Sequence, residues 1–281
     1  MIKKRRRILS AALILVLFLG TALPSAAAAE DTVNVLLIGL DGRPGLSGCR
    51  SDTMVLCSYR PENSTLTLVS FLRDLYLPIP GHGRNRLNAA YAFGGRELLL
   101  KTLEENFGLE IDGCVEVNFN QFSAIIDSLG GIQVLLREDE AHTINRECPG
   151  STVGSGTQLL SGEEALCFSR IRDLDPDGDF SRTRRQQVVL RAILARWKDA
   201  PITSMAAAVG DLLPMVSTDL SPVQIMDWVF TAAPARNNLN VQSLQIPRQE
   251  TCRDETVQGM SVIVCDIPEN RTYLEGQLGL K

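Results

Sequence analysis

The chain of 281 residues has 44% hydrophobic and 22% charged side chains, which allows one large globular domain or two small ones. Its formal net charge is −5 at pH 7, and the first 29 residues hold five basic and no acidic side chains, so the remainder is more acidic still. An acidic domain excludes general electrostatic binding of nucleic acid. The chain has no Cys-x-x-Cys and only two histidines, which argues against a structural zinc site.

The N-terminal segment 1–29 has the layout of a secretory leader. A basic stretch at 3–7 precedes an apolar run at 8–23 and an alanine-rich end. If it is not cleaved, residues 8–29 are long enough to cross a bilayer as a single anchor. Cleavage and retention both remain open. Either outcome places residues 30–281 at the extracytoplasmic face of the membrane or in the cell wall, anchored or secreted.

Strand and helix patterns alternate through the rest of the chain. Apolar β-rich runs predict strands, and helical periodicity with capping signals such as Ser161 and Glu164 predicts helices. The expected strands are 32–40, 53–60, 64–71, 114–119, 132–136, 239–246 and 261–265. The expected helices are 95–108, 120–131, 161–169, 182–197, 202–213 and 221–233. This order favours a mixed sheet covered by helices, with 138–160 as a surface loop or lid.

Charged side chains gather where the first three expected strands begin or end. The short Pro-Glu-Asn turn after residue 60 places residue 52 opposite about residue 72 in an antiparallel pair. The side chains brought to this edge are Asp41, Arg50, Asp52, Arg73 and Asp74. Carboxylates flanked by arginines suit a divalent metal together with a phosphorylated ligand. The alternative is ion pairing between neighbouring surface residues.

The helix expected at 182–197 carries polar residues on its buried stripe. Stepping back from Val189 by three, four and seven positions reaches Gln186, Arg185 and Arg182. A buried guanidinium needs a partner, and a bound anion near a helix N-terminus would supply one. Ion pairing with nearby aspartates is the alternative.

The segment just before this helix can be interpreted in two ways. Residues 173–184 match a calcium loop at several positions, but position 12 is Arg184 where that loop needs a bidentate Glu. Arg170 and Arg172 are two residues apart, so in an extended segment both point the same way. The sequence therefore favours phosphate over calcium here.

The cysteines permit disulfides if the domain lies outside the cytoplasm. Cys252 and Cys265 flank an expected hairpin and are the favoured pair, and Cys49 with Cys148 could form a second. The other three (Cys57, Cys114 and Cys167) fall in apolar patterns that indicate inert core residues.

These motifs together resemble the LytR-CpsA-Psr family of cell-wall phosphotransferases, in the family's order over about 34–190. The matching segments are NVLLIGLDGR (34–43), CRSDTMVL (49–56), VSFLRDLYLPIP (69–80), RNRLNAAYAFGG (84–95), LSGEEALCFSRIRD (160–173) and DGDFSRTRRQQVVL (177–190). The resemblance implies that residues 30–281 form an extracytoplasmic catalytic domain. It also implies a three-layer α/β/α sandwich with a central mixed β-sheet and an apolar groove for a prenyl chain.

Members of this family transfer glycopolymers from a polyprenyl-pyrophosphate carrier to peptidoglycan. The resemblance implies the same partners here, at the membrane and without nucleic acid. Carried over by position, Asp41 and Asp52 would hold Mg²⁺ (or Mn²⁺). The implied pyrophosphate ligands are Arg50, Arg73, Arg86, Arg170, Arg172, Arg182, Arg185 and Gln186. Arg86 departs from the family pattern, which often has Lys there, and Leu72 stands where Pro is common.

The expected reaction is attack by an acceptor hydroxyl on the phosphorus that carries the glycan. Asp52, Arg73 and Asp74 are the expected catalytic residues, and Asp74 is the expected general base because a carboxylate beside Arg73 stays ionised. Asp179 is the alternative base. Two other functions remain open: a pyrophosphatase that uses water as the acceptor, and an envelope regulator that binds lipid pyrophosphate without turnover.

Overall fold

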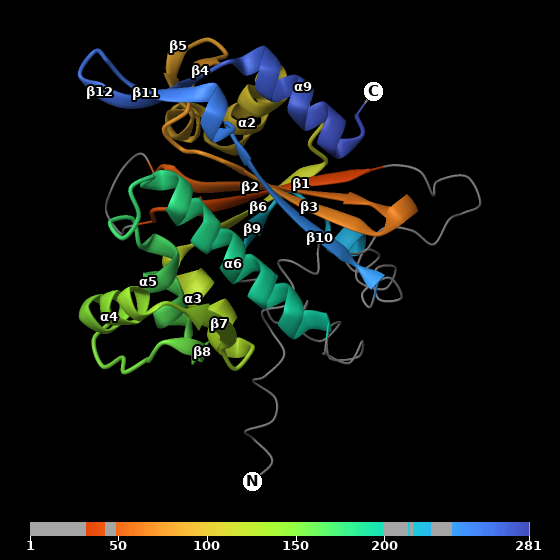
Figure 1. Cartoon of the computed structure of the whole chain (residues 1–281). Coiled ribbons are helices and arrows are strands. Elements are labelled where there is room, and N and C mark those ends of the chain that lie inside the picture. Colours follow the sequence, from red (N-terminus) through yellow and green to blue (C-terminus); the bar gives the residue numbers. More distant parts are fainter. Residues whose placement is uncertain (1–31, 43–48, 199–212, 214–215, 226–237, 281) are drawn as a thin grey trace.

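The middle layer of the protein is a six-stranded sheet in the order β10-β3-β2-β1-β6-β9. The structure, a computed structural model, describes residues 32–42, 49–198, 213, 216–225 and 238–280 (Figure 1). The strands are β1 (Val33–Leu40), β2 (Ser51–Arg60), β3 (Thr65–Phe71), β6 (Gly113–Asn118), β9 (Ser217–Thr218) and β10 (Asn240–Ile246). β1 pairs antiparallel with β2 and parallel with β6, so the sheet is mixed, as expected.

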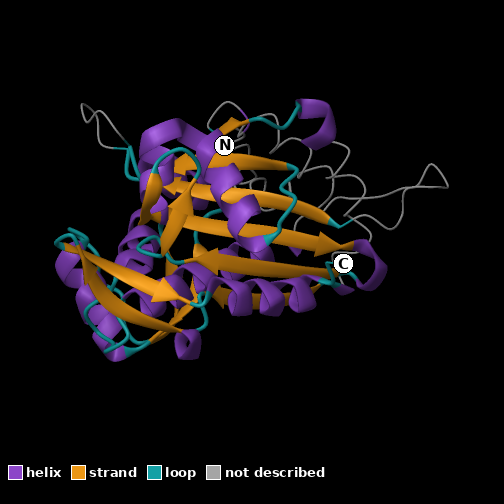
Figure 2. Cartoon of the chain, turned by 90° about the horizontal axis from the view of Figure 1, so that it is seen from above, coloured by secondary structure: helices purple, strands orange, loops and turns teal. Residues whose placement is uncertain are grey.

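The middle of β1 is a continuous apolar run because both faces of the sheet are covered. Val35 and Leu37 pack into the core on one side, and Leu36 and Ile38 pack into the core on the other. Successive side chains of a strand point to opposite faces, so a strand buried on both faces needs a continuous apolar run. β2 and β3 contribute to both cores in the same way. Figure 2 shows the strands of the sheet side by side from above.

Helices cover both faces of the sheet and complete a three-layer α/β/α sandwich, which confirms the expected fold class (Figure 1). The upper layer in Figure 1 holds α2 (Leu87–Phe107), α9 (Ile267–Leu278), the hairpin of β4 (Tyr76–Ile79) with β5 (Gly83–Arg86), and the hairpin of β11 (Cys252–Val257) with β12 (Met260–Cys265). The lower layer holds α3 (Phe119–Ser128), α4 (Glu138–Glu147), α5 (Gly162–Arg170), α6 (Asp179–Lys198), and the hairpin of β7 (Ile132–Leu136) with β8 (Gly156–Leu160). Two short 3-10 turns are η2 (Pro61–Asn63) and η5 (Gln249–Thr251).

The region 138–160 is not the long loop that we expected, because it contains α4 and β8. The sequence of α4 is strongly polar, and its buried side includes Glu140 and Thr143, so it has few of the apolar residues by which a buried helix face is predicted. Its first turn is acidic, which suits a helix N-terminus, and the Arg137 backbone N–H donates to the Glu140 carboxylate at 3.0 Å. Local capping therefore stabilises a helix that hydrophobic patterning does not reveal.

Several other expectations differ from the structure or fall outside the described residues. α2 begins at Leu87, ahead of the expected 95, and is kinked at Gly94 and Gly95. The leader 1–29, the helix at 202–213 and most of the helix at 221–233 lie outside the described residues. In the ranges that the structure does describe, no helix has the length and apolarity needed to cross a membrane.

The hairpin β11–β12 confirms the turn expected between Cys252 and Cys265. The two strands are joined by Gln258 and Gly259, whose φ angles of 51° and 79° suit a two-residue hairpin turn. Cys252 stands directly opposite Cys265, and both are free thiols in this structure. The favoured cysteine pair is therefore adjacent in space.

The second expected cysteine pair is wrong. Cys148, at the end of α4, lies beside Cys167 of α5, whereas Cys49 belongs to the loop that precedes β2. Cys57 and Cys114 are buried in the core as expected. Cys167 is only partly buried, because α5 turns it toward α4 rather than toward the sheet.

Gly162, the first residue of α5, allows α3 and α5 to pack closely. A Cβ at this position would lie 2.0 Å from the Ser123 carbonyl oxygen, so Gly162→Ala must push the two helices apart. We expect this substitution to lower the free energy of unfolding by about 1–3 kcal/mol, the usual cost of overpacking. Urea denaturation of the purified protein measures the difference.

Gly276→Ala on α9 is the matched control for this prediction. Nothing lies within 4 Å of a Cβ at Gly276. The higher helix propensity of alanine should therefore stabilise this variant by up to about 1 kcal/mol. If Gly162→Ala proved as stable as Gly276→Ala, the close approach of α3 and α5 would be wrong.

Candidate functional site

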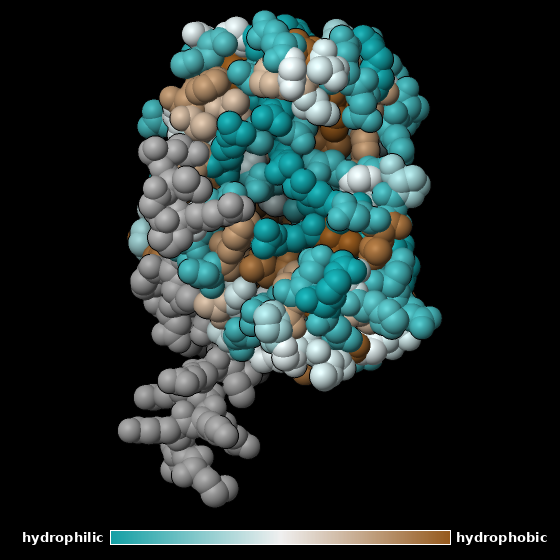
Figure 3. Space-filling view, turned by 90° about the vertical axis from the view of Figure 1, so that its left-hand side faces the viewer, coloured by the Kyte–Doolittle hydropathy of each residue, from teal (hydrophilic) through white to brown (hydrophobic). Residues whose placement is uncertain are grey.

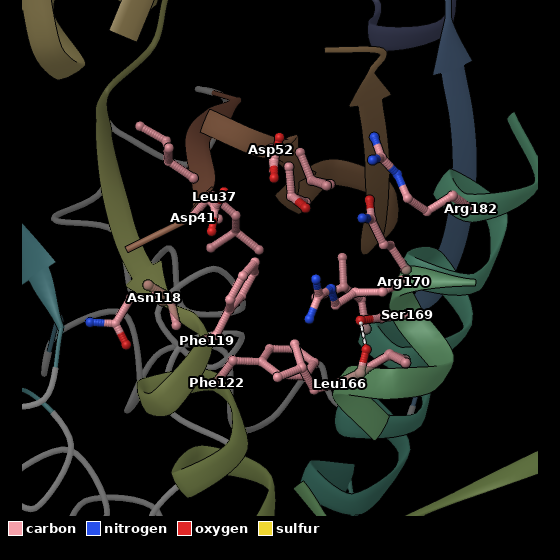
Figure 4. Close-up of a pocket in the computed structure, with 18 of the residues that line it drawn as sticks. Leu37, Asp41, Asp52, Asn118, Phe119, Phe122, Leu166, Ser169, Arg170 and Arg182 are labelled. Carbon is pink, nitrogen blue, oxygen red and sulfur yellow. Dashed lines mark hydrogen bonds between the residues drawn. The ribbon is translucent and has the colours of Figure 1, made fainter. Parts of the chain in front are cut away.

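A cavity of about 390 Å³ lies between the sheet and the helices α3, α5 and α6 (Figure 4). The side of the molecule shown in Figure 3 carries hydrophilic residues gathered above a band of hydrophobic ones. The wall of the cavity has the same two parts, one charged and one apolar. Its shape and chemistry are those of a site for a ligand with a polar head and an apolar tail.

The charged part of the wall forms where β1 and β3 end, where β2 begins, and where α6 starts. It consists of Asp41, Asp52, Arg73, Arg170, Arg172, Arg182 and Gln186. All of these were expected in the site from the sequence. Figure 4 shows Asp41 and Asp52 on the strand side of the cavity, facing Arg170 and Arg182 on the helix side.

The apolar part of the wall comes from the lower face of the sheet and from the helices below it. It consists of Leu37, Val55, Val117, Phe119, Phe122, Ile125, Leu166, Val189, Leu190 and Ile193. Sequence reasoning did not identify these residues, because apolar side chains at helical spacing indicate a core whether or not a cavity lies beside them. The two aromatic residues Phe119 and Phe122 on α3 were the feature of the sequence that could have indicated this apolar wall.

The register of β2 against β3 brings Asp52 to Arg73. Met54 pairs with Phe71, and extending this register places residue 52 opposite residue 73, one position from the expected partner. The Arg73 Nη1 atom donates to Asp52 Oδ1 at 2.7 Å. A charge-assisted hydrogen bond of this length ties the start of β2 to the end of β3. The expected meeting of these two residues is confirmed.

Asp179 lies at the centre of the arginines at the N-terminus of α6. One of its carboxylate oxygens lies 2.9 Å from Arg182 Nη2 and 3.8 Å from Arg73 Nε, and the other lies 3.6 Å from Arg172 Nε. Burial raises the pKa of Asp179, against the opposing effect of Arg73 and Arg172. Asp179 is not part of the cavity wall. It therefore acts as a counter-ion outside the cavity wall that holds three arginines together.

Arg182 is buried with part of its hydrogen-bonding capacity unused. Its side chain is 5% exposed, and Nη2 donates to Asp179. In the described part of the chain, no group accepts a hydrogen bond from the buried Nε atom of Arg182. The anion preference of the cavity comes from its wall, where Arg182 and three other arginines stand against two carboxylates.

Arg185 is buried on the same helix, but it faces away from the cavity. Its Nε atom donates to Glu140 of α4 at 2.8 Å, and its Nη2 atom bonds to Asp175. Hydrogen bonds from Arg137 and Arg185 lower the pKa of Asp175 to about 2. The expectation that Arg185 binds pyrophosphate conflicts with this placement, because the protein itself supplies the acid partners that explain its burial.

Arg170 and Arg172 both line the cavity, but not for the expected reason. Arg170 is the last residue of α5, so the segment is not a continuous extended one. Its guanidinium lies 4.9 Å from the centre of the Phe119 ring, a distance typical of a cation–π contact. Arg172 follows in the loop and contacts Asp179.

The other expected residues lie at the edge of the site. Asp74 accepts ion pairs from Arg73 and Arg86, each at 3.3 Å, and neither Asp74 nor Arg86 lines the cavity. Arg50 is exposed and is not part of the cavity wall. The structure therefore gives Asp74 a position from which it orients the two arginines.

The calcium interpretation of residues 173–184 finds no support in the structure. Asp177 lies 2.6 Å from Arg184, and the neighbouring aspartates are paired with other arginines. Among the described residues, no group of three or more His, Cys, Asp or Glu side chains could hold a metal ion. Asp175, Asp177 and Asp179 of this segment are counter-ions for arginines.

Asp41 and Asp52 are a donor set that fits a metal shared with a phosphorylated ligand. Both line the cavity, and the Asp41 backbone N–H donates to the Arg50 carbonyl at 3.2 Å, which closes the intervening loop. Mg²⁺ in proteins is bound by one or two carboxylates, with phosphate oxygens and water in the remaining positions. Two carboxylates at the charged end of this cavity match that requirement.

The fold and cavity define an α/β protein built to receive an anionic head and an apolar tail. The chain belongs to the LytR-CpsA-Psr family, because the model of the LytR_cpsA_psr family matches residues 20–277. The cavity residues lie inside this match.

Similar proteins include a curated relative and solved structures. The polyisoprenyl-teichoic acid–peptidoglycan teichoic acid transferase TagU of Oceanobacillus iheyensis is 34% identical over 88% of this chain and 75% of its own length. A structure of TagT bound to LIIa-WTA has a TM-score of 0.75 and 29% identity, over 92% of this chain and 95% of that one. A structure of TagT with bound octaprenyl pyrophosphate lipid has a TM-score of 0.71 and 28% identity, with the same coverage.

Proposed function

We propose that this protein is an extracytoplasmic phosphotransferase that moves a glycopolymer from a polyprenyl-pyrophosphate carrier to peptidoglycan. The observation that carries the proposal is the two-part cavity, whose arginine-rich end adjoins a long apolar wall. A polyprenyl pyrophosphate has the same two parts in the same order. The relative named as a teichoic acid transferase and the neighbour that holds octaprenyl pyrophosphate support this choice of substrate.

In this proposal the pyrophosphate lies at the charged end. Arg170 and Arg182 approach it from helices, Arg172 approaches it from the loop between them, and Arg73 approaches it from the segment that follows β3. Guanidinium groups form paired hydrogen bonds with phosphate oxygens, and the first turn of α6 adds a favourable dipole. The prenyl chain lies against Phe122 and the apolar residues of α6.

The reaction is attack by an acceptor hydroxyl oxygen on the phosphorus that carries the glycan. The bond from that phosphorus to the bridging oxygen breaks, and polyprenyl monophosphate leaves. Arg73 and Arg182 neutralise the negative charge that develops on the leaving phosphate. The carboxylate that receives the acceptor proton must reach the cavity, and Asp74 and Asp179 do not line it. Asp52 is held by Arg73, so we assign the proton to Asp41, through the carboxylate oxygen that does not bind a metal.

We also propose that Asp41 and Asp52 hold Mg²⁺ (or Mn²⁺), which would polarise the pyrophosphate oxygens when bound. Asp52 has a second task, because its Oδ1 atom accepts the hydrogen bond from Arg73. The same carboxylate would thus serve both as a ligand of the metal and as the partner of Arg73. The leader at 1–29 would keep this site close to the lipid carrier, either as an anchor or after export.

Arg182 provides the first test of the function. Arg182→Gln should lower the transfer rate by about 10²–10³-fold, the usual effect of removing one preorganised donor at the reacting group. The assay uses purified protein, a polyprenyl-pyrophosphate-linked glycan, Mg²⁺ and peptidoglycan, and it measures covalently linked polymer. Arg184→Gln is the control, because Arg184 pairs with Asp177 and is half exposed. Equal rates for the two variants would contradict the proposed site.

The same assay separates the alternative functions. Release of polyprenyl monophosphate at the same rate without peptidoglycan would indicate a pyrophosphatase. Binding of the lipid pyrophosphate without any product, even after long incubation, would indicate a regulator that does not turn over its ligand. Either result would replace transfer as the function of this site.

The metal assignment has its own test. Asp52→Asn removes a ligand charge, so we expect half-maximal transfer to require roughly tenfold more Mg²⁺, equivalent to about 1.4 kcal/mol of binding energy. Titration of Mg²⁺ against transfer rate, after treatment with a chelator, gives this number. Glu62→Gln, an exposed site in η2, is the control. Full activity of the chelated wild-type protein would rule the metal out.

The apolar end is tested by filling it. Leu190 lines the cavity, so Leu190→Trp should weaken binding of a long-chain polyprenyl pyrophosphate about tenfold or more while leaving a short-chain analogue less affected. Val188→Trp on the same helix is the control, since Val188 is 40% exposed and lies outside the cavity wall. Equal loss for both chain lengths would place the prenyl chain elsewhere.

A further inference from the structure

The two cysteines at the base of the hairpin β11–β12 occupy a position that suits a disulfide. Cys252 is the first residue of β11 and Cys265 is the last residue of β12, and the register pairs them directly. Residues that are directly opposite in an antiparallel pair point to the same face of the ribbon. Their sulfur atoms are therefore on one side of the hairpin.

The hydrogen-bond pattern shows which kind of pair this is. The Asp266 backbone N–H donates to the Thr251 carbonyl at 3.2 Å, so residues 251 and 266 form a hydrogen-bonded pair. Pairs alternate along an antiparallel ladder, which makes Cys252 and Cys265 a non-hydrogen-bonded pair with Cα atoms about 4.5 Å apart. A disulfide requires a Cα separation of about 4.4–6.8 Å. The backbone thus already has a spacing that a disulfide can bridge.

The surroundings of the pair are consistent with contact between the two thiols. Both side chains are partly buried and pack against the core between the sheet and the upper layer. Burial and the neighbouring Cys252 raise the pKa of the Cys265 thiol to about 12. The Cys252 thiol donates to the Gln249 carbonyl at 3.5 Å, so it has a defined orientation.

We propose that Cys252 and Cys265 form a disulfide after export, which closes the base of the hairpin β11–β12. Both S–H bonds break, one S–S bond forms, and two electrons and two protons pass to an external disulfide, which becomes two thiols. The oxidant is the disulfide of a thiol–disulfide oxidoreductase or of a small thiol. The inference rests on the extracytoplasmic location in the proposed function, because such bonds persist in oxidising compartments.

The hairpin is connected to the segment that carries the site arginine. The Ile263 backbone N–H donates to the Asp74 carbonyl at 2.9 Å, and Leu75 forms a parallel bridge with Ile263. Asp266, next to Cys265, caps the start of α9. A bond between the two cysteines therefore holds β12 against the residues that follow Arg73.

Peptide mapping tests the bond without any variant and without the transfer assay. The purified full chain is incubated with oxidised glutathione, denatured in the presence of an alkylating agent that blocks every free thiol, and digested with trypsin. Cleavage after Arg253 separates peptide 249–253 from peptide 254–271, so only a disulfide keeps them together. We expect one linked species that reduction separates, while buried Cys57 is recovered alkylated as an unbridged thiol. Unlinked peptides from the folded, oxidised protein would overturn the proposal.

Stability gives an independent reading. The oxidised wild-type protein should have a Tm roughly 5 °C above the Cys252→Ser/Cys265→Ser double variant. A reductant should lower the wild-type Tm to that of the variant and leave the variant unchanged. A reductant effect of the same size in both proteins would contradict a bond at this pair. Because these readouts do not depend on turnover, a protein that forms the bond but transfers no polymer would refute the proposed function alone.

Discussion

The site depends on one requirement: a guanidinium group taken out of water must find negative charge close by. Arg182 and Arg185 lie on consecutive positions of the buried stripe of α6, and both are almost fully buried. The protein supplies an acceptor for every nitrogen of the Arg185 guanidinium, whereas Arg182 donates to Asp179 through Nη2 alone among the described residues. The first turns of α6 therefore hold one arginine with a structural role, Arg185, and one that faces the cavity, Arg182. Arg182 lines the cavity together with three other arginines and two carboxylates, and this balance of charge favours an anion there.

The arrangement of the charged residues follows from the topology of the sheet. β1 and β3 end, and β2 begins, at the same edge, so residues far apart in the chain meet there. The acids on the strands and the arginines on the helices then face each other across the cavity (Figure 4). Asp74 and Asp179 lie outside the cavity wall, where they form ion pairs that orient the arginines without contacting the cavity themselves.

Much of this arrangement could be predicted from the sequence, because strand periodicity and a short turn determine a register. The meeting of Asp52 with Arg73 was predicted to within one position for this reason. Arg185 was assigned to the wrong partner, because its place on the buried face of α6 predicts that it is buried but not which group it contacts. Its partner Glu140 lies in α4, which was expected to be a loop. The apolar wall could not be predicted, since Leu190 or Ile193 beside a cavity has the same sequence pattern as one in a filled core.

The helix α6 gives the cavity an internal length scale. Arg182 and Ile193 both line the cavity, and the eleven helical steps from one position to the other correspond to about 16 Å of helix. The helix α6 is rigid, so it holds the side chain that faces the head of a ligand and the side chain that faces its tail at a fixed distance from each other. A ligand that has the charge without the chain, or the chain without the charge, can satisfy only one of these two contacts. If the proposed function is right, the protein would distinguish lipid carriers from soluble phosphates by the length of the ligand as well as by its charge.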